Sequence, residues 1–145
     1  MPSIRLAEAN SNLQPTYMYL FTYRSTSTYR KFGSCHGMEL PFVFGVLDDL
    51  DVILFTGRDR AREAVMRQVQ QAWVNFARTG NPSQPGLVWP RYEQKTRQTM
   101  QIGITSRAVS DPNSAQRTLW DGLPFDGVTP PAVDMWTLVW ENGSP

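Results

Sequence analysis

The residues best suited to chemistry lie in one glycine-flanked segment, Gly33-Ser34-Cys35-His36-Gly37. Cys35 and His36 are the only cysteine and the only histidine of the chain. A thiolate is a nucleophile, and an imidazole can take up and return a proton near neutral pH. Two catalytic hypotheses are therefore possible, and a third interpretation is that His36 is an ordinary surface or structural histidine.

The first hypothesis makes Cys35 the nucleophile of a G-x-C-x-G turn, a cysteine version of the nucleophile elbow. Such a turn follows a strand directly and opens a helix. Here the nearest predicted strand ends several residues earlier, and the following residues, MELPFVF, contain Pro41 and are expected to be non-helical. His36 is the only available base, and a neighbour in sequence rarely faces the same reacting atom. The pattern disfavours this hypothesis.

The second hypothesis makes His36 a general base. Its ordinary pKa lies close to neutrality, so it can serve both as proton acceptor and as proton donor in one cycle. A loop that follows a sheet strand is also where α/β folds place functional groups. Spacing and periodicity do not distinguish this role from that of a surface histidine.

Other polar and apolar clusters have simpler interpretations. Asp48, Asp49 and Asp51 lack the ligand pattern of a calcium loop and are expected to be a solvated turn. One cysteine and one histidine exclude a disulfide within the chain and a Cys/His zinc centre, so we expect no metal and no cofactor.

The apolar residues around His36 either line a pocket or anchor the loop; they are Met38, Phe42 and Phe44.

Composition bounds the class of protein. The 145 residues are 41% hydrophobic and 19% charged, with a net charge of +1, which fits one globular domain and excludes charge-driven disorder. The arginines are scattered, so no nucleic-acid partner is expected. The first ten residues do not form a secretory signal, and no apolar run is long enough to span a membrane. The sequence taken as it stands is compatible with the cytoplasm, and the compartment is left open.

The first half of the chain predicts two elements and a long irregular segment. Residues 3–10 have the spacing of a short helix, which has little to pack against. Residues 16–25, rich in Tyr, Phe and Thr, predict a strand. This strand is apolar on both faces, which is typical of a central strand in a covered sheet. Residues 26–58 are expected to be irregular.

The second half predicts a helix and a further strand. An apolar stripe runs from Ala61 to Phe76 at spacings of three and four, with Asp59 as N-cap and Gly80 as the stop. Residues 98–104 predict a strand, and the order strand, loop, helix, strand is that of a parallel crossover in an α/β sheet. From Ser106 onward, where Trp120, Trp136 and Trp140 occur, the chain is expected to be irregular.

Several motifs in order resemble one family. Residues 33–45, GSCHGMELPFVFG, resemble the catalytic-histidine segment of the type-B carboxylesterases. The resemblance continues through AWVNFARTGNP at 72–82, LVWPRY at 87–92 and MQIG at 100–103, and it fades around Trp120. Together these motifs cover most of the chain and are far more specific than a single pentapeptide.

The resemblance implies an α/β-hydrolase fold and hydrolysis of small carboxylic esters. In this family the triad order is serine, acidic residue, histidine, and the histidine takes the serine proton and then protonates the leaving alcohol. His36 occupies the histidine position. Met38, at a variable position of the motif, is a candidate to line the acyl or alcohol pocket. Glu39 also matches the family, and we assign it no chemical role.

The chain departs from the family by having no G-x-S-x-G motif. The resemblance therefore implies that residues 1–145 correspond to the C-terminal part of an α/β-hydrolase domain. This part would contain the last strands and helix of a mostly parallel sheet and a long active-site loop. Nucleophile and acid would lie outside the chain, which is expected to be inactive alone and to require a complementing N-terminal esterase part.

Two alternatives belong to other classes of function. One is a non-catalytic interaction module derived from the same fold, as in cholinesterase-like adhesion proteins. The other is a small stand-alone domain with a function of its own. The intact motif around His36 favours the esterase over the first of these.

Overall fold

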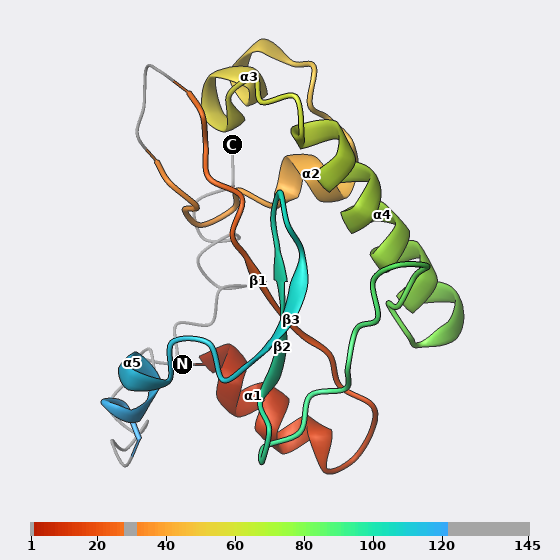
Figure 1. Cartoon of the computed structure of the whole chain (residues 1–145), viewed down its shortest axis with the longest axis vertical. Coiled ribbons are helices and arrows are strands. Elements are labelled where there is room, and N and C mark those ends of the chain that lie inside the picture. The colour runs from red at the N-terminus through yellow and green to blue at the C-terminus, as the bar shows by residue number, and fades with distance from the viewer. Residues whose placement is uncertain (1, 28–31, 122–145) are drawn as a thin grey trace, which may run out of the picture. The chain divides into compact units, whose positions relative to one another are not determined.

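A computed structural model describes residues 2–27 and 32–121 of the chain (Figure 1). Residues 1–114 and 115–145 form two compact units. No helix in the described ranges is long and apolar enough to cross a bilayer. The elements in chain order are α1 (Pro2–Ser11), β1 (Met18–Phe21), α2 (Leu40–Phe44), α3 (Leu50–Thr56), α4 (Arg62–Thr79), β2 (Gln98–Ile102), β3 (Arg107–Ser110) and α5 (Ser114–Thr118).

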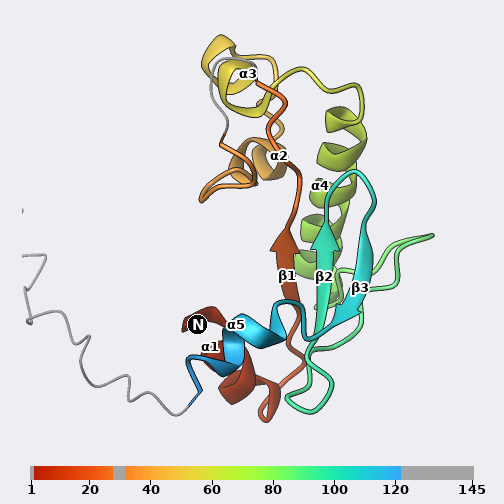
Figure 2. The same ribbon diagram turned by 60° about the vertical axis from the view of Figure 1, so that its left-hand side comes forward.

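The first unit contains a three-stranded sheet in the order β1-β2-β3 (Figure 2). β1 runs parallel to β2, with Met18 opposite Thr99 and Phe21 opposite Ile102, which confirms the predicted crossover. β1 is shorter than predicted and lies at an edge of the sheet in the described residues, so the expectation of a central strand is not met there. β3 pairs antiparallel with β2, which corrects the prediction of an irregular tail.

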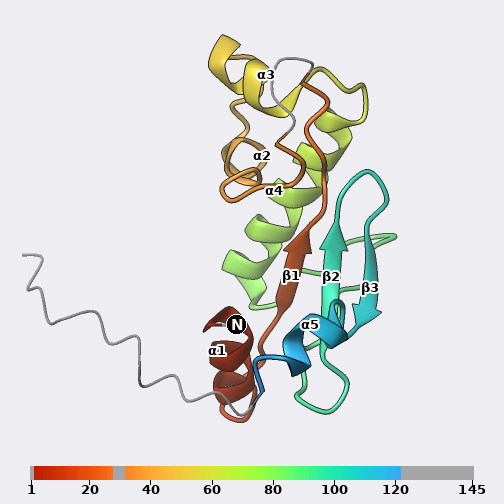
Figure 3. The same ribbon diagram turned by 90° about the vertical axis from the view of Figure 1, so that its left-hand side faces the viewer.

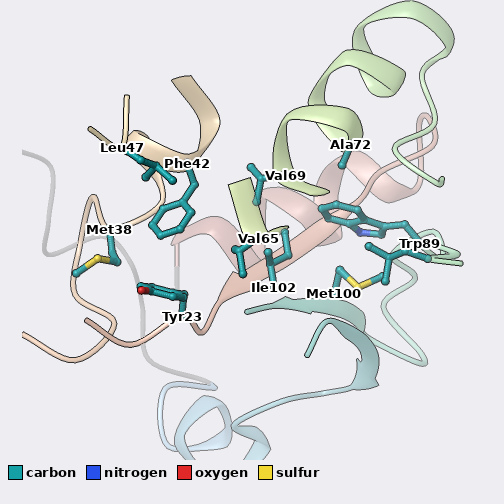
Figure 4. Close-up of a cluster of buried hydrophobic side chains, with 11 residues drawn as sticks. Tyr23, Met38, Phe42, Leu47, Val65, Val69, Ala72, Trp89, Met100 and Ile102 are labelled. Carbon is teal, nitrogen blue, oxygen red and sulfur yellow. The ribbon is translucent and has the colours of Figure 1, made fainter. Parts of the chain in front are cut away.

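α4 covers one face of this sheet, as the view in Figure 3 shows. Its apolar stripe buries Val65, Val69 and Ala72 in the same core as Met100 and Ile102 of β2 (Figure 4). The 3.6-residue period of the helix places these three side chains on one face, and their burial stabilises the helix against the sheet.

The ends of α4 differ in how well they were predicted. Gly80 ends the helix with φ 72°, a left-handed conformation that glycine adopts without strain. Asp59 does not occupy the N-cap position, which belongs to Ala61. Instead Asp59 Oδ1 accepts a hydrogen bond from the Ala61 N–H at 2.6 Å, so it caps the turn that precedes the helix. The predicted N-cap is therefore wrong by two residues.

α1 has partners that its sequence does not reveal. The Glu8 carboxylate forms an ion pair with Arg97, which also donates to the Tyr92 hydroxyl at 3.1 Å. The Asn10 amide donates to the Thr16 hydroxyl at 2.8 Å. These polar contacts tie the helix to the segments before β1 and β2, and Ala7 is its one buried residue in the described chain.

The segment between β1 and α4 contains two helices where an irregular run was expected. α2 carries Pro41 in its first turn, where the missing N–H breaks no helical bond, and Gly45 ends it with φ 73°. α3 follows Asp49 and ends at Gly57, which has φ 83°. Both helices are too short to show a periodic pattern, which is why the sequence did not reveal them.

The carbonyl groups at the end of α3 bind the segment that follows β1. The Tyr23 hydroxyl and the Thr26 N–H donate to the Thr56 carbonyl at 3.3 and 3.2 Å. The Ser25 hydroxyl donates to the Phe55 carbonyl at 2.6 Å. The carbonyls at a helix C-terminus lack partners within the helix, so these bonds satisfy them and fix α3 beside the chain leaving β1.

The second unit is described only as far as residue 121. It contains most of α5, a helix that the sequence did not predict, and Arg117 pairs with Asp121 at 2.5 Å. Trp120 is 55% exposed. Trp136 and Trp140 lie outside the described residues.

Candidate functional site

His36 lies on the loop that follows the carboxyl end of β1. Its side chain is exposed, and its ring has no hydrogen-bond or ion-pair partner among residues 2–27 and 32–121. Two residues earlier, the Ser34 hydroxyl donates to the carbonyl of Phe21, the last residue of β1, at 2.7 Å. In open α/β sheets, ligands bind beyond the carboxyl ends of the strands, which is where this loop is held.

Two glycines and a tight turn shape the loop on either side of the imidazole. Gly33 and Gly37 have φ values of 63° and 77°, which residues with a Cβ rarely adopt. The Met38 N–H donates to the Cys35 carbonyl at 3.2 Å, and the chain then enters α2. The loop reverses tightly at His36 and leaves its ring in solvent.

The loop is anchored by side chains that enter the core. Met38 and Phe42 are 0% exposed, and both point into the buried cluster shown in Figure 4. The Phe42 ring lies 4.8 Å from that of Tyr23 and 5.2 Å from that of Phe21, measured between centroids. Phe44, in contrast, is 72% exposed. Of the three apolar residues that flank His36, two are anchors and one lies at the surface.

Burial also controls the ionisation of an anchoring residue. Burial raises the pKa of the Tyr23 hydroxyl, and Asp59 adds to this effect, against the opposing influence of Thr26 and Arg62. The hydroxyl is therefore neutral at physiological pH and serves as the hydrogen-bond donor to Thr56.

Cys35 is half-buried and packs against the core. Contrary to expectation, the segment MELPFVF does contain a helix, α2, but this helix begins at Leu40, five residues beyond the cysteine. β1 ends at Phe21, well before it. The direct strand–turn–helix connection of a nucleophile elbow is absent at this described position.

The acidic cluster is a solvated segment. Asp48, Asp49 and Asp51 are exposed, and Asp48 lies 3.5 Å from the Arg62 guanidinium. Within the described ranges no group of His, Cys, Asp and Glu side chains is arranged to hold a metal ion.

Two grooves of the first unit lie away from His36. The first, the aromatic groove, has a volume of about 220 Å³ and was not predicted from the sequence. It is lined by side chains of β1 and the residues before it, of α4 and of the loop after α4. These residues are Tyr17, Tyr19, Ala72, Trp73, Phe76, Pro82 and Trp89. The second, of about 470 Å³, lies beside α3 and includes Leu50, Leu54 and Arg58. The alternation of Tyr17 and Tyr19 and the helical spacing of Trp73 and Phe76 were the sequence signal for the first groove.

A strand, a covering helix and a parallel strand, with a histidine on the loop beyond the first strand, form part of an α/β-hydrolase fold. A solved thermophilic PNB esterase superposes on 81% of this chain with a TM-score of 0.73 and 32% sequence identity. The chain belongs to the carboxylesterase family, whose model matches residues 1–120.

Two curated relatives illustrate the range of this similarity. Para-nitrobenzyl esterase of Bacillus subtilis is 35% identical over 117 residues, which cover 80% of this chain and 24% of the relative. Human neuroligin-2 is 29% identical over 142 residues, which cover 82% of this chain and 17% of the relative. The chain thus spans about a quarter or less of the length of these proteins, and likewise 24% of the solved PNB esterase.

Proposed function

We propose that this chain supplies the general-base histidine, His36, of a serine hydrolase that cleaves small carboxylic esters. The observation that carries the proposal is the exposed imidazole beyond the carboxyl end of β1, inside an intact family motif. The ring would accept the proton of the nucleophilic serine as its oxygen attacks the ester carbonyl. It would then donate that proton to the departing alcohol, so the two steps use one group.

The serine, the acidic residue and the oxyanion donors of this proposal lie outside the chain. Oxyanion donors alone contribute about two to three orders of magnitude to the rate of such reactions. We therefore expect the chain by itself neither to hydrolyse esters nor to react covalently with a fluorophosphonate. Labelling of the isolated chain, with turnover that His36→Ala abolishes, would contradict this part of the proposal.

The proposed partner is the remaining, N-terminal part of an esterase domain. The surface proposed to bind this partner is the edge of β1 that has no neighbouring strand in the described sheet. The aromatic groove between β1 and α4 adjoins this edge. Tyr19, 37% exposed, and Phe76, 49% exposed, contribute to that groove. A further parallel strand would satisfy the backbone groups of this edge and cover the rings.

Met38 remains a proposed pocket residue. Its side chain is fully buried beneath the histidine loop, so any contact with substrate depends on how the assembled domain opens this region. Replacing Met38 by Leu should change the preference among acyl chains of different length while leaving His36 functional. An unchanged preference would remove Met38 from the binding site.

The proposal is tested by grafting residues 1–120 in place of the matching segment of the Bacillus subtilis para-nitrobenzyl esterase. Hydrolysis of a para-nitrobenzyl ester is then compared between the graft and its His36→Ala variant. We expect activity in the graft and a loss of several orders of magnitude in the variant. A folded but inactive graft would favour the alternative, a non-catalytic interaction module.

A further inference from the structure

In the part of the chain that the structure describes, the Ser34 side chain links the loop that carries His36 to the sheet. Its hydroxyl donates at 2.7 Å to the carbonyl of Phe21, across thirteen positions of sequence. Nearby, the Ser25 N–H donates to the Gly33 carbonyl at 2.9 Å. Among the described residues, these two bonds hold the chain just before His36 against the end of β1, and the bond of Ser34 is the one that reaches a residue of the strand.

The second fastening point lies on the other side of the histidine. Met38, two residues after His36, is fully buried, and α2 continues from there into the core. His36 is therefore held midway between the Ser34 hydroxyl and the Met38 side chain. Gly37, with φ 77°, adds no steric restraint of its own to the intervening backbone.

We propose that Ser34 is a positioning residue for His36. The inference rests on the proposed function, and it concerns geometry rather than proton transfer. Without the hydroxyl, the Phe21 carbonyl lies at an exposed position where water can replace the donor, so the fold is retained. The loop then keeps its buried anchor at Met38 and loses its anchor at the strand.

A change in histidine position acts on the chemical step. Displacing a reacting group by about 1 Å costs up to about a hundredfold in rate, whereas substrate binding far from that group is unaffected. Ser34→Ala should therefore lower kcat of the grafted esterase between about tenfold and a hundredfold. KM should stay nearly the same, because the Ser34 hydroxyl is bonded to the Phe21 carbonyl and its proposed role concerns the chemical step.

The matched control is Ser11→Ala. Ser11 also donates its hydroxyl to a main-chain carbonyl, that of Glu8 at 2.9 Å, but it lies in α1. Ser11→Ala should leave kcat unchanged. Ser34→Thr, which retains a hydroxyl, should restore most of the lost kcat. Equal kcat values for the wild-type graft and Ser34→Ala would overturn the proposal.

A second readout does not depend on catalysis. Because the full chain has one histidine, its proton NMR spectrum contains a single pair of imidazole signals. Ser34→Ala should shift and broaden these signals, and Ser11→Ala should not. If the graft with Ser34 in place is inactive, the proposed function fails, but the imidazole signals of the full chain still test the role of Ser34. Identical imidazole signals in Ser34→Ala and Ser11→Ala would refute that role.

Discussion

α4 and the segment between β1 and α4 contribute to one core in different ways. α4 has eighteen residues with an apolar stripe, so its own sequence specifies the helix. The preceding segment has two helices of five and seven residues, which are too short to be stable alone. Its shape depends on Phe42 and Met38 in the core and on side-chain bonds to main-chain carbonyls. The candidate catalytic residue lies in this second region, where tertiary contacts rather than local propensity set the structure.

The largest effect expected from this contrast is the loss of a buried anchor. Phe42→Ala removes a ring that contacts both Phe21 and Tyr23, and it should lower the free energy of unfolding by about 3 to 5 kcal/mol. Urea denaturation measures this loss as a lower midpoint. Phe44→Ala is the matched control, since Phe44 is 72% exposed in the same helix, and it should change the midpoint little. Similar losses in both variants would contradict the anchoring role.

A second prediction concerns the bond between Tyr23 and α3. Tyr23→Phe removes the donor to the Thr56 carbonyl and should cost about 1 kcal/mol at neutral pH. Because burial raises the pKa of Tyr23 in the folded state, the unfolded state loses its proton first as pH rises. The contribution of this pKa shift to the free energy of unfolding is therefore fully present below about pH 10 and declines above it.

The variant should reduce this alkaline decline. It should not abolish it, since burial also raises the pKa values of Tyr19 and Tyr92. Unfolding free energies measured on both sides of pH 10 test the prediction. An equally steep decline in Tyr23→Phe would show that Tyr23 is not its source.

A smaller effect is expected where α4 binds α2. The Gln70 amide donates to the Val43 carbonyl at 3.4 Å, and a Cβ at Gly45 would lie 2.6 Å from the same nitrogen. Gln70→Ala should cost about 0.5 to 1 kcal/mol, because this bond is long and partly exposed. Gln71→Ala, which removes only an exposed bond within α4, serves as control. Equal urea midpoints for the two variants would argue against a link between the helices.

The smallest effect belongs to the surface of α4. Arg67 and Glu63 are 3.5 Å apart, and both side chains are about two-thirds exposed. Arg67→Ala should change stability by at most about 0.5 kcal/mol, and less at high salt. If urea denaturation shows a larger loss of unfolding free energy that salt does not change, then burial of the apolar face does not account for the stability of α4.

The contrast between the two regions also explains which features the sequence revealed. The apolar spacing from Val65 to Ala72 predicted α4, and Gly80 predicted its end, because both signals are local. The parallel pairing of β1 with β2 followed from the order of elements. The motif around His36 identified the candidate base, since it depends on residue types and not on distant contacts.

Features that depend on distant contacts were missed. Pro41 indicated a break, yet it lies in the first turn of α2, a short helix that buries Phe42 in the core. β3 is largely exposed and lacks a strong alternating pattern, and its position depends on pairing with β2. The bond from Ser34 to Phe21 joins residues thirteen apart, so no local pattern indicates it. The geometry that positions the candidate base therefore required the structure.

The most direct test of the central claim measures proton acceptance by His36 without turnover. The graft in the para-nitrobenzyl esterase is treated with a fluorophosphonate, and the rate of serine labelling is compared with that of His36→Gln. If His36 activates the serine, the rate should fall by at least about a thousandfold in the variant, while the urea midpoint stays the same. Equal labelling rates in the two proteins would contradict the assignment of His36 as the general base.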